Sequence, residues 1–332
     1  MIEKVKRYLD EKGLKVDDNL LKYIENGIEI SENDEYKHDF GSFPPHHNES
    51  WYFNFIDRPN NVFLITRWSF EMYDRRSLVM FVLIVDGKIT TYFQDISVDS
   101  MLDNWEFDKR VKYYCIKPMQ QWRVTFEDKK VKMDITFNAR FPVFNYLSGE
   151  YPIDAIEEYG IELLDVAAQQ HYEQGMKATG TLLLKKTDET RRINCLGHRD
   201  HSWGTRDWVG IDRWYWISAQ FEDKTVNITR VEFRGKITHN GFISSKDGNI
   251  VIKKIEVTTE TKDDGKTPLT STFILTDENG NKHTIISHTI FTLHFPVPVK
   301  EGFTEVFEQI TTFKFEGKEG DGIAEYLIST RQ

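Results

Sequence analysis

Residues 197–208 of the chain read Gly197-His198-Arg199-Asp200-His201-Ser202-Trp203-Gly204-Thr205-Arg206-Asp207-Trp208. This stretch combines histidines, aspartates, arginines and tryptophans between glycines, and the aromatic run Trp214-Tyr215-Trp216 follows shortly after it. A solvated loop rarely carries so many large rings, and a purely structural core rarely carries so many titratable groups. The stretch therefore predicts the wall of a cavity.

An extended conformation gives the two sides of this stretch different contents. Side chains alternate between the faces of a β-strand, so one face is expected to carry Arg199, His201 and Trp203. The other face is expected to carry His198, Asp200 and Ser202. We therefore expect one face to line a pocket and the other face to orient it.

The composition favours a β protein with more than one domain. The chain has 332 residues, more than a single hydrophobic core usually spans, and 14% of them are aromatic, a class that favours pleated surfaces. Its formal net charge of -10 argues against the basic surface that nucleic-acid binding requires. We expect an uncharged or cationic partner.

Hydrophobic periodicity divides the chain into a helical beginning and two strand-rich parts. Residues 1–27 show helical spacing, and from Asp39 onward apolar residues alternate between short polar turns. The sequence has no βαβ alternation and no glycine-rich phosphate loop, which disfavours a nucleotide-binding fold. We predict a mainly β protein with two antiparallel barrels or sandwiches. The expected parts are a helical extension (1–35), a first β domain (36–165) and a second β domain (166–332).

The sequence offers no feature that directs the chain into or across a membrane. No apolar run approaches the roughly 18 residues that a membrane helix needs, and residues 1–7 lead into no signal-peptide core. We expect no membrane span and a cytoplasmic location.

Cys115 and Cys195 lie in apolar settings and are expected to be free core residues. The helical extension is expected to pack on the first domain or on a second subunit, which leaves a homodimer open.

His201 and Trp203 form the leading catalytic pair. A histidine titrates near neutral pH, so it can act as an acid or a base, and burial beside an aspartate such as Asp200 shifts its pKa. A tryptophan face beside it can stabilise a developing cation. The structural alternative is a core histidine and a core tryptophan that close the end of a barrel.

Glu173 is the best carboxylate partner for the stretch. It lies in the preceding predicted strand, where antiparallel pairing across the hairpin brings it close. The ordinary alternative is a structural ion pair with Arg199 or Arg206, which are expected to hold Asp200, Asp207 or Glu173 in place. The expected substrate contacts come from both halves of the chain: Glu49, Trp51, Arg199, Trp203, Arg206, Trp208 and Trp214.

Two other kinds of site fit the sequence less well. Ser202 has only the trailing half of a Gly-x-Ser-x-Gly elbow and no helix after it, which argues against a serine hydrolase. His198 and His201 point to opposite faces of a strand, so they do not converge on a metal ion. A later group of histidines is expected to be hydrogen-bonded or on the surface: His283, His288 and His294. We expect no metal site.

The segment from His171 to Thr181, the run from Gly197 to Trp208 and the sequence Trp214-Tyr215-Trp216 resemble the carotenoid hydratase (hydroxyneurosporene synthase) and AttH-like superfamily. The resemblance implies two lipocalin-like β domains with an apolar cavity in or between them. It also implies chemistry without metal or organic cofactor on unsaturated substrates, mostly isoprenoid or polyketide, such as alkene hydration, terpenoid cyclisation and Diels-Alder closure. A His-x-Trp pair of the hydratases maps onto His201 and Trp203. Their Tyr-x-Asp pair maps onto Tyr215, but Ile217 stands at the position of the aspartate.

These observations favour a cofactor-independent hydratase or other lyase, an isomerase or a cyclase acting on an apolar unsaturated, isoprenoid-like substrate. A buried, protonated Asp200 or Glu173 is expected to act with His201, while Trp203, Trp214 and Tyr215 shelter the cation. The alternative is a lipocalin-like carrier of a hydrophobic small molecule. A third hypothesis is a glycoside-active protein with paired carboxylates on an aromatic platform.

Overall fold

The computed structural model describes residues 2–11, 29–38, 43, 45–98, 110–146, 157, 160–161, 170–205, 211–233, 235–299 and 302–331, and it is mainly β. A short helix, α1 (Ile2–Glu11), and a 3-10 turn, η1 (Glu32–Glu35), precede the strands. The second part of the predicted helical pair, after residue 11, lies outside the described residues. None of the helices in the described ranges is long and apolar enough to span a bilayer.

The first sheet is antiparallel and open. Its path runs β4-β3-β2-β1-β10-β9-β7-β6-β5, and β8 pairs with β9. The strands are β1 (His47–Asp57), β2 (Val62–Glu71), β3 (Arg76–Val85), β4 (Lys88–Ser97), β5 (Val111–Lys117), β6 (Gln121–Glu127), β7 (Val131–Ala139), β8 (Phe144–Asn145), β9 (Gln170–Leu184) and β10 (Glu189–Thr205). β9 and β10 come after the boundary expected at residue 165, yet they hydrogen-bond to β7 and β1.

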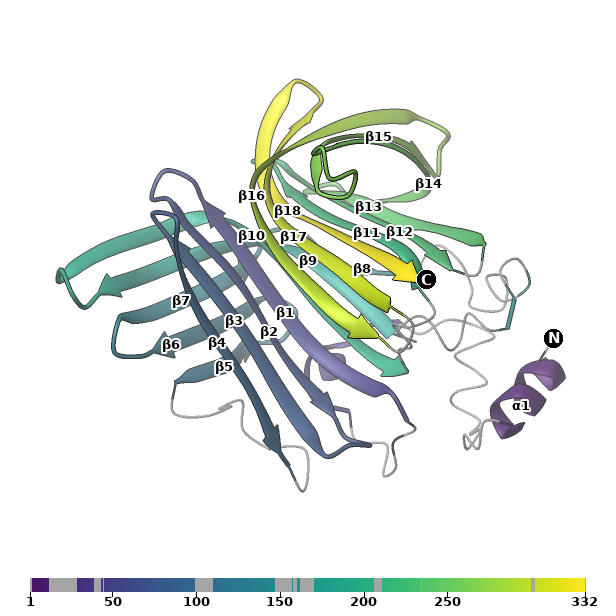
Figure 1. Cartoon of the computed structure of the whole chain (residues 1–332), viewed down its shortest axis with the longest axis horizontal. Helices are drawn as coiled ribbons and strands as arrows, with labels where there is room; N and C mark the ends of the chain where they lie inside the picture. The colour runs from purple at the N-terminus through teal and green to yellow at the C-terminus, as the bar shows by residue number, and fades with distance from the viewer. Residues whose placement is uncertain are drawn as a thin grey trace.

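This sheet curls into a half-barrel (Figure 1). Its inner face is rich in buried aromatic side chains. The rings of Phe81 on β3 and Phe126 on β6 stack with centroids 4.0 Å apart, although these strands are far apart in the sheet order. Phe53 on β1 likewise meets Phe137 on β7 at 5.2 Å. Alternation puts every second aromatic side chain on this face, so the curl buries them against one another.

The second unit is a closed antiparallel barrel. Its strands are β11 (Ile211–Gln220), β12 (Lys224–Phe233), β13 (Lys236–Ser245), β14 (Gly248–Thr261), β15 (Pro268–Asp277), β16 (Lys282–Val299), β17 (Gly302–Phe315) and β18 (Lys318–Arg331). β11 pairs with both β12 and β18, so the barrel has no free edge. The mainly β class is confirmed. The first unit is an open half-barrel, whereas the second unit is a closed barrel.

The half-barrel and the barrel pack through their outer faces. β1, β2 and β3 contribute outward side chains that pack in one cluster with barrel residues such as Leu293, Ile310 and Ile323. The ring of Tyr52 meets the ring of Trp216 edge-on at 5.4 Å. β10 therefore separates two environments, the inner face of the half-barrel and the contact with the barrel (Figure 1).

Candidate functional site

The alternation predicted for residues 197–208 is present in β10 as far as Gly204. His201 and Trp203 share the inner face, with ring centroids 4.9 Å apart. His198 points to the outer face, where Gln220 of the barrel lies 3.1 Å from its Nδ1. The dense stretch thus supplies two separate clusters, one on each side of the sheet.

The inner cluster consists of His38, Glu49 and His201 with the rings of Trp51 and Trp203. Glu49 Oε1 lies 2.7 Å from His38 Nδ1 and 3.0 Å from His201 Nε2. The Trp51 ring stacks on His201 at 4.3 Å, and the Trp203 ring stacks on His38 at 4.1 Å. Glu49 and His201 are fully buried, whereas 18% of the His38 side chain is exposed.

The titration of this cluster is set by burial and by ion pairing. Burial would lower the pKa of His38, but hydrogen bonds with Asp34 and Glu49 outweigh it and raise the pKa to about 9. For His201, burial outweighs Glu49 and lowers the pKa. Burial would raise the pKa of Glu49, but both histidines together lower it. The cluster therefore holds a carboxylate and a cationic His38 near neutral pH.

A buried ion pair between Glu35 and Arg199 holds residues 31–38 against the inner face of the half-barrel. Arg199 donates hydrogen bonds to the carboxylate of Glu35, which lies in η1, and Tyr172 donates to the same carboxylate at 2.6 Å. Burial would raise the pKa of Glu35, but the charge of Arg199 lowers it. Arg199 therefore pairs with Glu35 and not with Asp200 or Glu173, because both of these lie on the other face.

The outer cluster is centred on Glu173. The hairpin predicted that Glu173 lies close to the stretch, and the pairing of β9 and β10 places it opposite Asp200. Its carboxylate lies 2.6 Å from His198 Nε2 and 3.0 Å from His171 Nε2, and it accepts hydrogen bonds from Trp216 Nε1 at 2.8 Å and from Asn227. Burial would raise the pKa of Glu173, but His171 and His198 lower it to about 2. Glu173 is therefore a carboxylate and not the protonated acid.

Two rows of side chains face each other where the half-barrel meets the barrel, and we call this region the seam. On the half-barrel, strand register aligns Glu173, Asp200, Tyr52, Arg67 and Met80. On the barrel, it aligns Thr229, Trp216, Glu325, Glu308 and Leu293. Asp200, Arg67 and Glu325 are partly exposed, so solvent reaches the seam.

Glu308 has the properties expected of a protonated acid. Its side chain is buried opposite Glu325, and both burial and the charge of Glu325 raise its pKa well above the ordinary value. Its Oε2 atom is buried without a hydrogen-bond partner in the described part of the chain. The charges of Glu308 and Glu325 also act on Tyr52, whose pKa is raised first by its burial.

The remaining predicted site residues are dispersed. Tyr215 lies inside the barrel, where its ring meets Tyr326 at 5.5 Å and the guanidinium of Arg230 covers it. Trp214 lies on the outer surface of the barrel and packs beside the seam. Arg206, Asp207 and Trp208 lie outside the described residues. Asp200 lies in the seam with 18% of its side chain exposed, 3.9 Å from His171.

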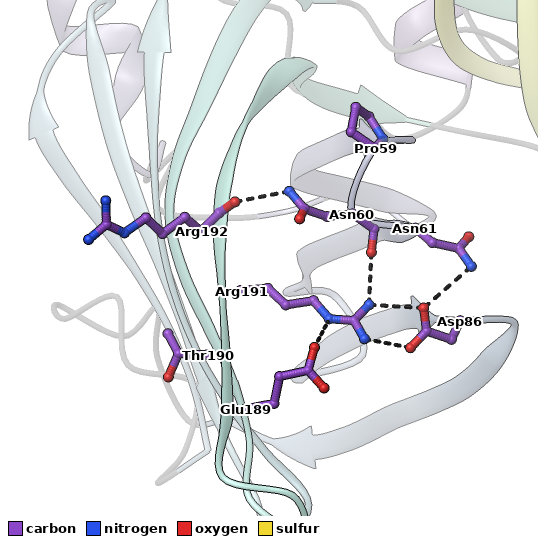
Figure 2. Close-up of a pocket in the computed structure, with 8 residues that line it drawn as sticks. All are labelled: Pro59, Asn60, Asn61, Asp86, Glu189, Thr190, Arg191 and Arg192. Atoms are coloured by element: carbon purple, nitrogen blue, oxygen red, sulfur yellow. Dashed lines mark hydrogen bonds and ion pairs between the residues drawn. The ribbon is translucent and has the colours of Figure 1, made fainter.

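A surface hollow at the turn between β1 and β2 carries no catalytic arrangement. Arg191 there forms ion pairs with Asp86 and Glu189, at 2.6 and 2.8 Å, and Asn60 donates to the carbonyl of Arg192 at 3.0 Å (Figure 2). Arg192 is about 20 Å along β10 from His198. These contacts tie the turn to β10.

Sequence reasoning missed Glu35, His38, Glu308 and Glu325. The last two lie in alternating strand sequence, where a charged residue between apolar positions marks a surface or a site. The sequence contained this pattern of a charge among apolar positions. Alternation puts Glu308 on the same strand face as the buried Ile310, and it puts Glu325 on the same face as the buried Ile323. No local signal connects Glu35 or His38 with β10, since their contacts span more than 150 residues.

Comparison with known proteins relates most of the chain to one fold. The profile of a family described as "Domain of unknown function (DUF7064)" matches residues 31–329. No curated protein matches the sequence significantly. A putative AttH from Nitrosomonas europaea has a TM-score of 0.62 at 12% identity, covering 91% of this chain and 97% of that one.

Two further solved structures are similar. Kievitone hydratase from Nectria haematococca has a TM-score of 0.60 at 14% identity, with coverage of 91% of this chain and 93% of that one. The structure of CghA with Sch210972 has a TM-score of 0.59 at 11% identity, with coverage of 89% and 93%. The expected AttH-like fold is confirmed.

Proposed function

The chain belongs to the DUF7064 family, and we propose that it is a hydratase, isomerase or cyclase that protonates an apolar unsaturated substrate in the seam. The observation that carries the proposal is the carboxyl group of Glu308, which burial and Glu325 keep protonated. A neutral carboxylic acid near neutral pH can donate a proton to carbon, which an ionised one cannot. One structural relative is named kievitone hydratase, which agrees with a hydration reaction.

The surroundings of Glu308 suit a cationic intermediate. Trp216 lies beside Glu325 in the barrel row, and Tyr52 faces it from the half-barrel. Aromatic faces stabilise a nearby cation, most strongly where water is excluded. An isoprenoid alkene, which forms a tertiary cation on protonation, is the substrate class that we propose.

The proposed reaction returns every proton that it uses. Glu308 transfers its proton to an alkene carbon and becomes a carboxylate while the neighbouring carbon becomes cationic. In hydration, water adds to the cation and its extra proton returns to the carboxylate pair. In isomerisation or cyclisation, an adjacent C–H bond breaks instead and supplies that proton. Asp200 and Arg67 line the partly exposed part of the seam, where water enters.

Two residues predicted to be catalytic, His201 and Tyr215, take no direct part in this scheme. His201 lies on the opposite face of β10, and Tyr215 lies inside the barrel. Asp200 and Glu173 remain in the proposal as seam residues. Glu173 orients the ring of Trp216 by accepting a hydrogen bond from its Nε1–H at 2.8 Å.

The test uses purified protein incubated with a mixed isoprenoid and polyene extract in D₂O. Wild type is expected to give a product with carbon-bound deuterium, and Glu308→Gln is expected to lower its rate by about 10²- to 10⁴-fold, the usual contribution of general acid catalysis. Native mass spectrometry checks that the variant still binds the precursor. Glu319→Gln, at an exposed position of β18, is the matched control and is expected to react like wild type.

Two outcomes would overturn the proposal. Equal deuterium incorporation by Glu308→Gln and wild type would exclude Glu308 as the acid. Release of the same unaltered ligand from both proteins would establish a carrier of a hydrophobic molecule in place of an enzyme.

A further inference from the structure

The inner cluster brings three ligand-type side chains together away from the seam. One nitrogen of His38, one nitrogen of His201 and one oxygen of Glu49 lie within 4.8 Å of one another. They come from three segments, residues 31–38, β1 and β10. The backbone N–H of His38 donates to Oε2 of Glu49 at 3.1 Å and to Oε1 at 3.3 Å, and Oε1 is also the oxygen that faces both imidazoles.

The hydrogen bonds around His201 fix which of its nitrogens carries the proton. Tyr172 has one hydroxyl proton and donates it to the carboxylate of Glu35 at 2.6 Å. Its oxygen must then accept from Nδ1 of His201, 3.1 Å away. A neutral His201 therefore presents the lone pair of Nε2 to Oε1 of Glu49 at 3.0 Å. The lone pair of Nε2 and the carboxylate oxygen repel each other at this distance unless a cation lies between them.

His38 has a similar outer partner. Its Nε2 lies 3.3 Å from Asp34 Oδ1, so an N–H at that position has a carboxylate acceptor. Without an ion, the cationic His38 also carries a proton on Nδ1 and donates it to the same oxygen of Glu49 at 2.7 Å, and metal binding at Nδ1 releases this proton. Metal-binding histidines typically donate their second N–H to a carboxylate or another oxygen, which orients the ring. Both histidines here have such a partner.

We propose that His38, Glu49 and His201 bind a divalent transition-metal ion of the zinc type. Two imidazole nitrogens and one carboxylate oxygen suit zinc, cobalt or nickel, whereas calcium and magnesium prefer oxygen ligands alone. The ion takes the place of the Nδ1 proton of His38, and it satisfies the lone pair of His201 and the carboxylate of Glu49 at once. The partly exposed edge of His38 gives the route of entry.

A second three-residue group, His171, Glu173 and Asp200, also has ligand-type atoms within 4.8 Å. Its central carboxylate is already saturated, because Glu173 accepts from Trp216 and Asn227 and pairs with His198. The inner cluster is therefore the better candidate among the described residues.

The proposed ion connects the segment before β1 to the half-barrel. His38 is the ligand from that segment, and Glu35 of the same segment pairs with Arg199. Metal binding is therefore expected to stabilise the folded state by mass action, as any ligand specific to it does. This inference does not depend on the proton transfer proposed for Glu308, which lies on the other side of the sheet.

The test measures metal binding by the full-length chain after removal of metal with a chelator. Titration with Co²⁺ is expected to give one equivalent of a visible ligand-field absorption, and Zn²⁺ is expected to displace it and to raise the melting temperature. His201→Gln and His38→Gln are each expected to abolish the absorption. Tyr172→Phe keeps all three ligands and removes the acceptor of His201, so a 10- to 100-fold weaker affinity is expected.

His294→Gln is the matched control, because His294 also pairs with a glutamate but on the surface. It is expected to bind Co²⁺ like wild type. The proposal is overturned if the wild type binds no stoichiometric Co²⁺, which would leave a shared proton between His201 and Glu49. It is also overturned if His171→Gln abolishes binding while the well-folded Tyr172→Phe variant binds as tightly as wild type.

Discussion

Glu173 Oε2 lies 2.6 Å from Nε2 of His198, and both side chains are completely buried. This contact joins β9 to β10, and hydrogen bonds from Trp216 and Asn227 to the same carboxylate join the half-barrel to the barrel. A carboxylate in this position is paired on every side.

We expect Glu173→Ala to lower the free energy of unfolding by about 3–5 kcal/mol, the usual cost of removing one partner from a buried pair. The loss leaves the donors of His198, Trp216 and Asn227 without an acceptor. Urea unfolding measures it. Glu256→Ala, which removes an exposed glutamate paired with Lys254, is the control and is expected to change stability by less than about 1 kcal/mol. A similar small change in Glu173→Ala would contradict the role assigned to this carboxylate.

The sequence was sufficient to predict the class of the fold and the faces of β10. Alternating residues and short polar turns identify antiparallel strands, and the period of two separates His201 from His198. The same local logic put Glu173 close to this stretch, because the two strands form a hairpin.

The partners of these residues could not be predicted in the same way. Glu49 meets His201 because β1 pairs with β10, and this register lies outside any local pattern. The acid was expected at Asp200 or Glu173, but the pKa of Glu173 depends on two histidines that approach it in the folded chain. The pKa of Glu308 is raised by its burial and by Glu325, which the strand register places opposite it in the folded chain.

The ion pair between Glu35 and Arg199 gives a prediction about the segment before β1. Glu35→Met is expected to cost about 3–5 kcal/mol, because it leaves the buried guanidinium without a counter-charge. The double variant Glu35→Met, Arg199→Met is expected to recover most of that loss, since apolar replacement of a buried pair is often neutral. Urea unfolding of wild type, Glu35→Met, Arg199→Met and the double variant, the four proteins of this cycle, checks both statements. A double variant as unstable as the sum of the single variants would show that the pair is not coupled.

Gly322 gives a prediction about the closure of the barrel. A Cβ atom added there would lie 1.8 Å from the backbone oxygen of Ser218 on β11, so the two strands would have to separate. We expect Gly322→Ala to lower stability by about 1–3 kcal/mol, as overpacking usually does, with faster amide exchange in β11 and β18. Hydrogen exchange locates the effect. Protection in β11 and β18 equal to that of wild type would contradict this account.

The raised pKa of Glu308 gives a pH-dependent prediction that needs no substrate. Its folded-state pKa lies above the ordinary 4.5, so the folded state binds more protons than the unfolded one. The stability that this proton contributes is complete below about pH 4.5 and is lost as the pH rises toward the folded-state pKa. Glu308→Gln mimics the protonated form at every pH.

We therefore expect the stability of Glu308→Gln relative to wild type to increase by about 1.4 kcal/mol per pH unit above pH 4.5, until the folded-state pKa is reached. Urea unfolding between pH 4 and pH 9 measures this slope. Glu319→Gln replaces an exposed glutamate and is expected to run parallel to wild type across the range. If Glu308→Gln also ran parallel, Glu308 would be an ordinary carboxylate in the folded protein, and the acid of the proposed reaction would have to be sought elsewhere in the seam.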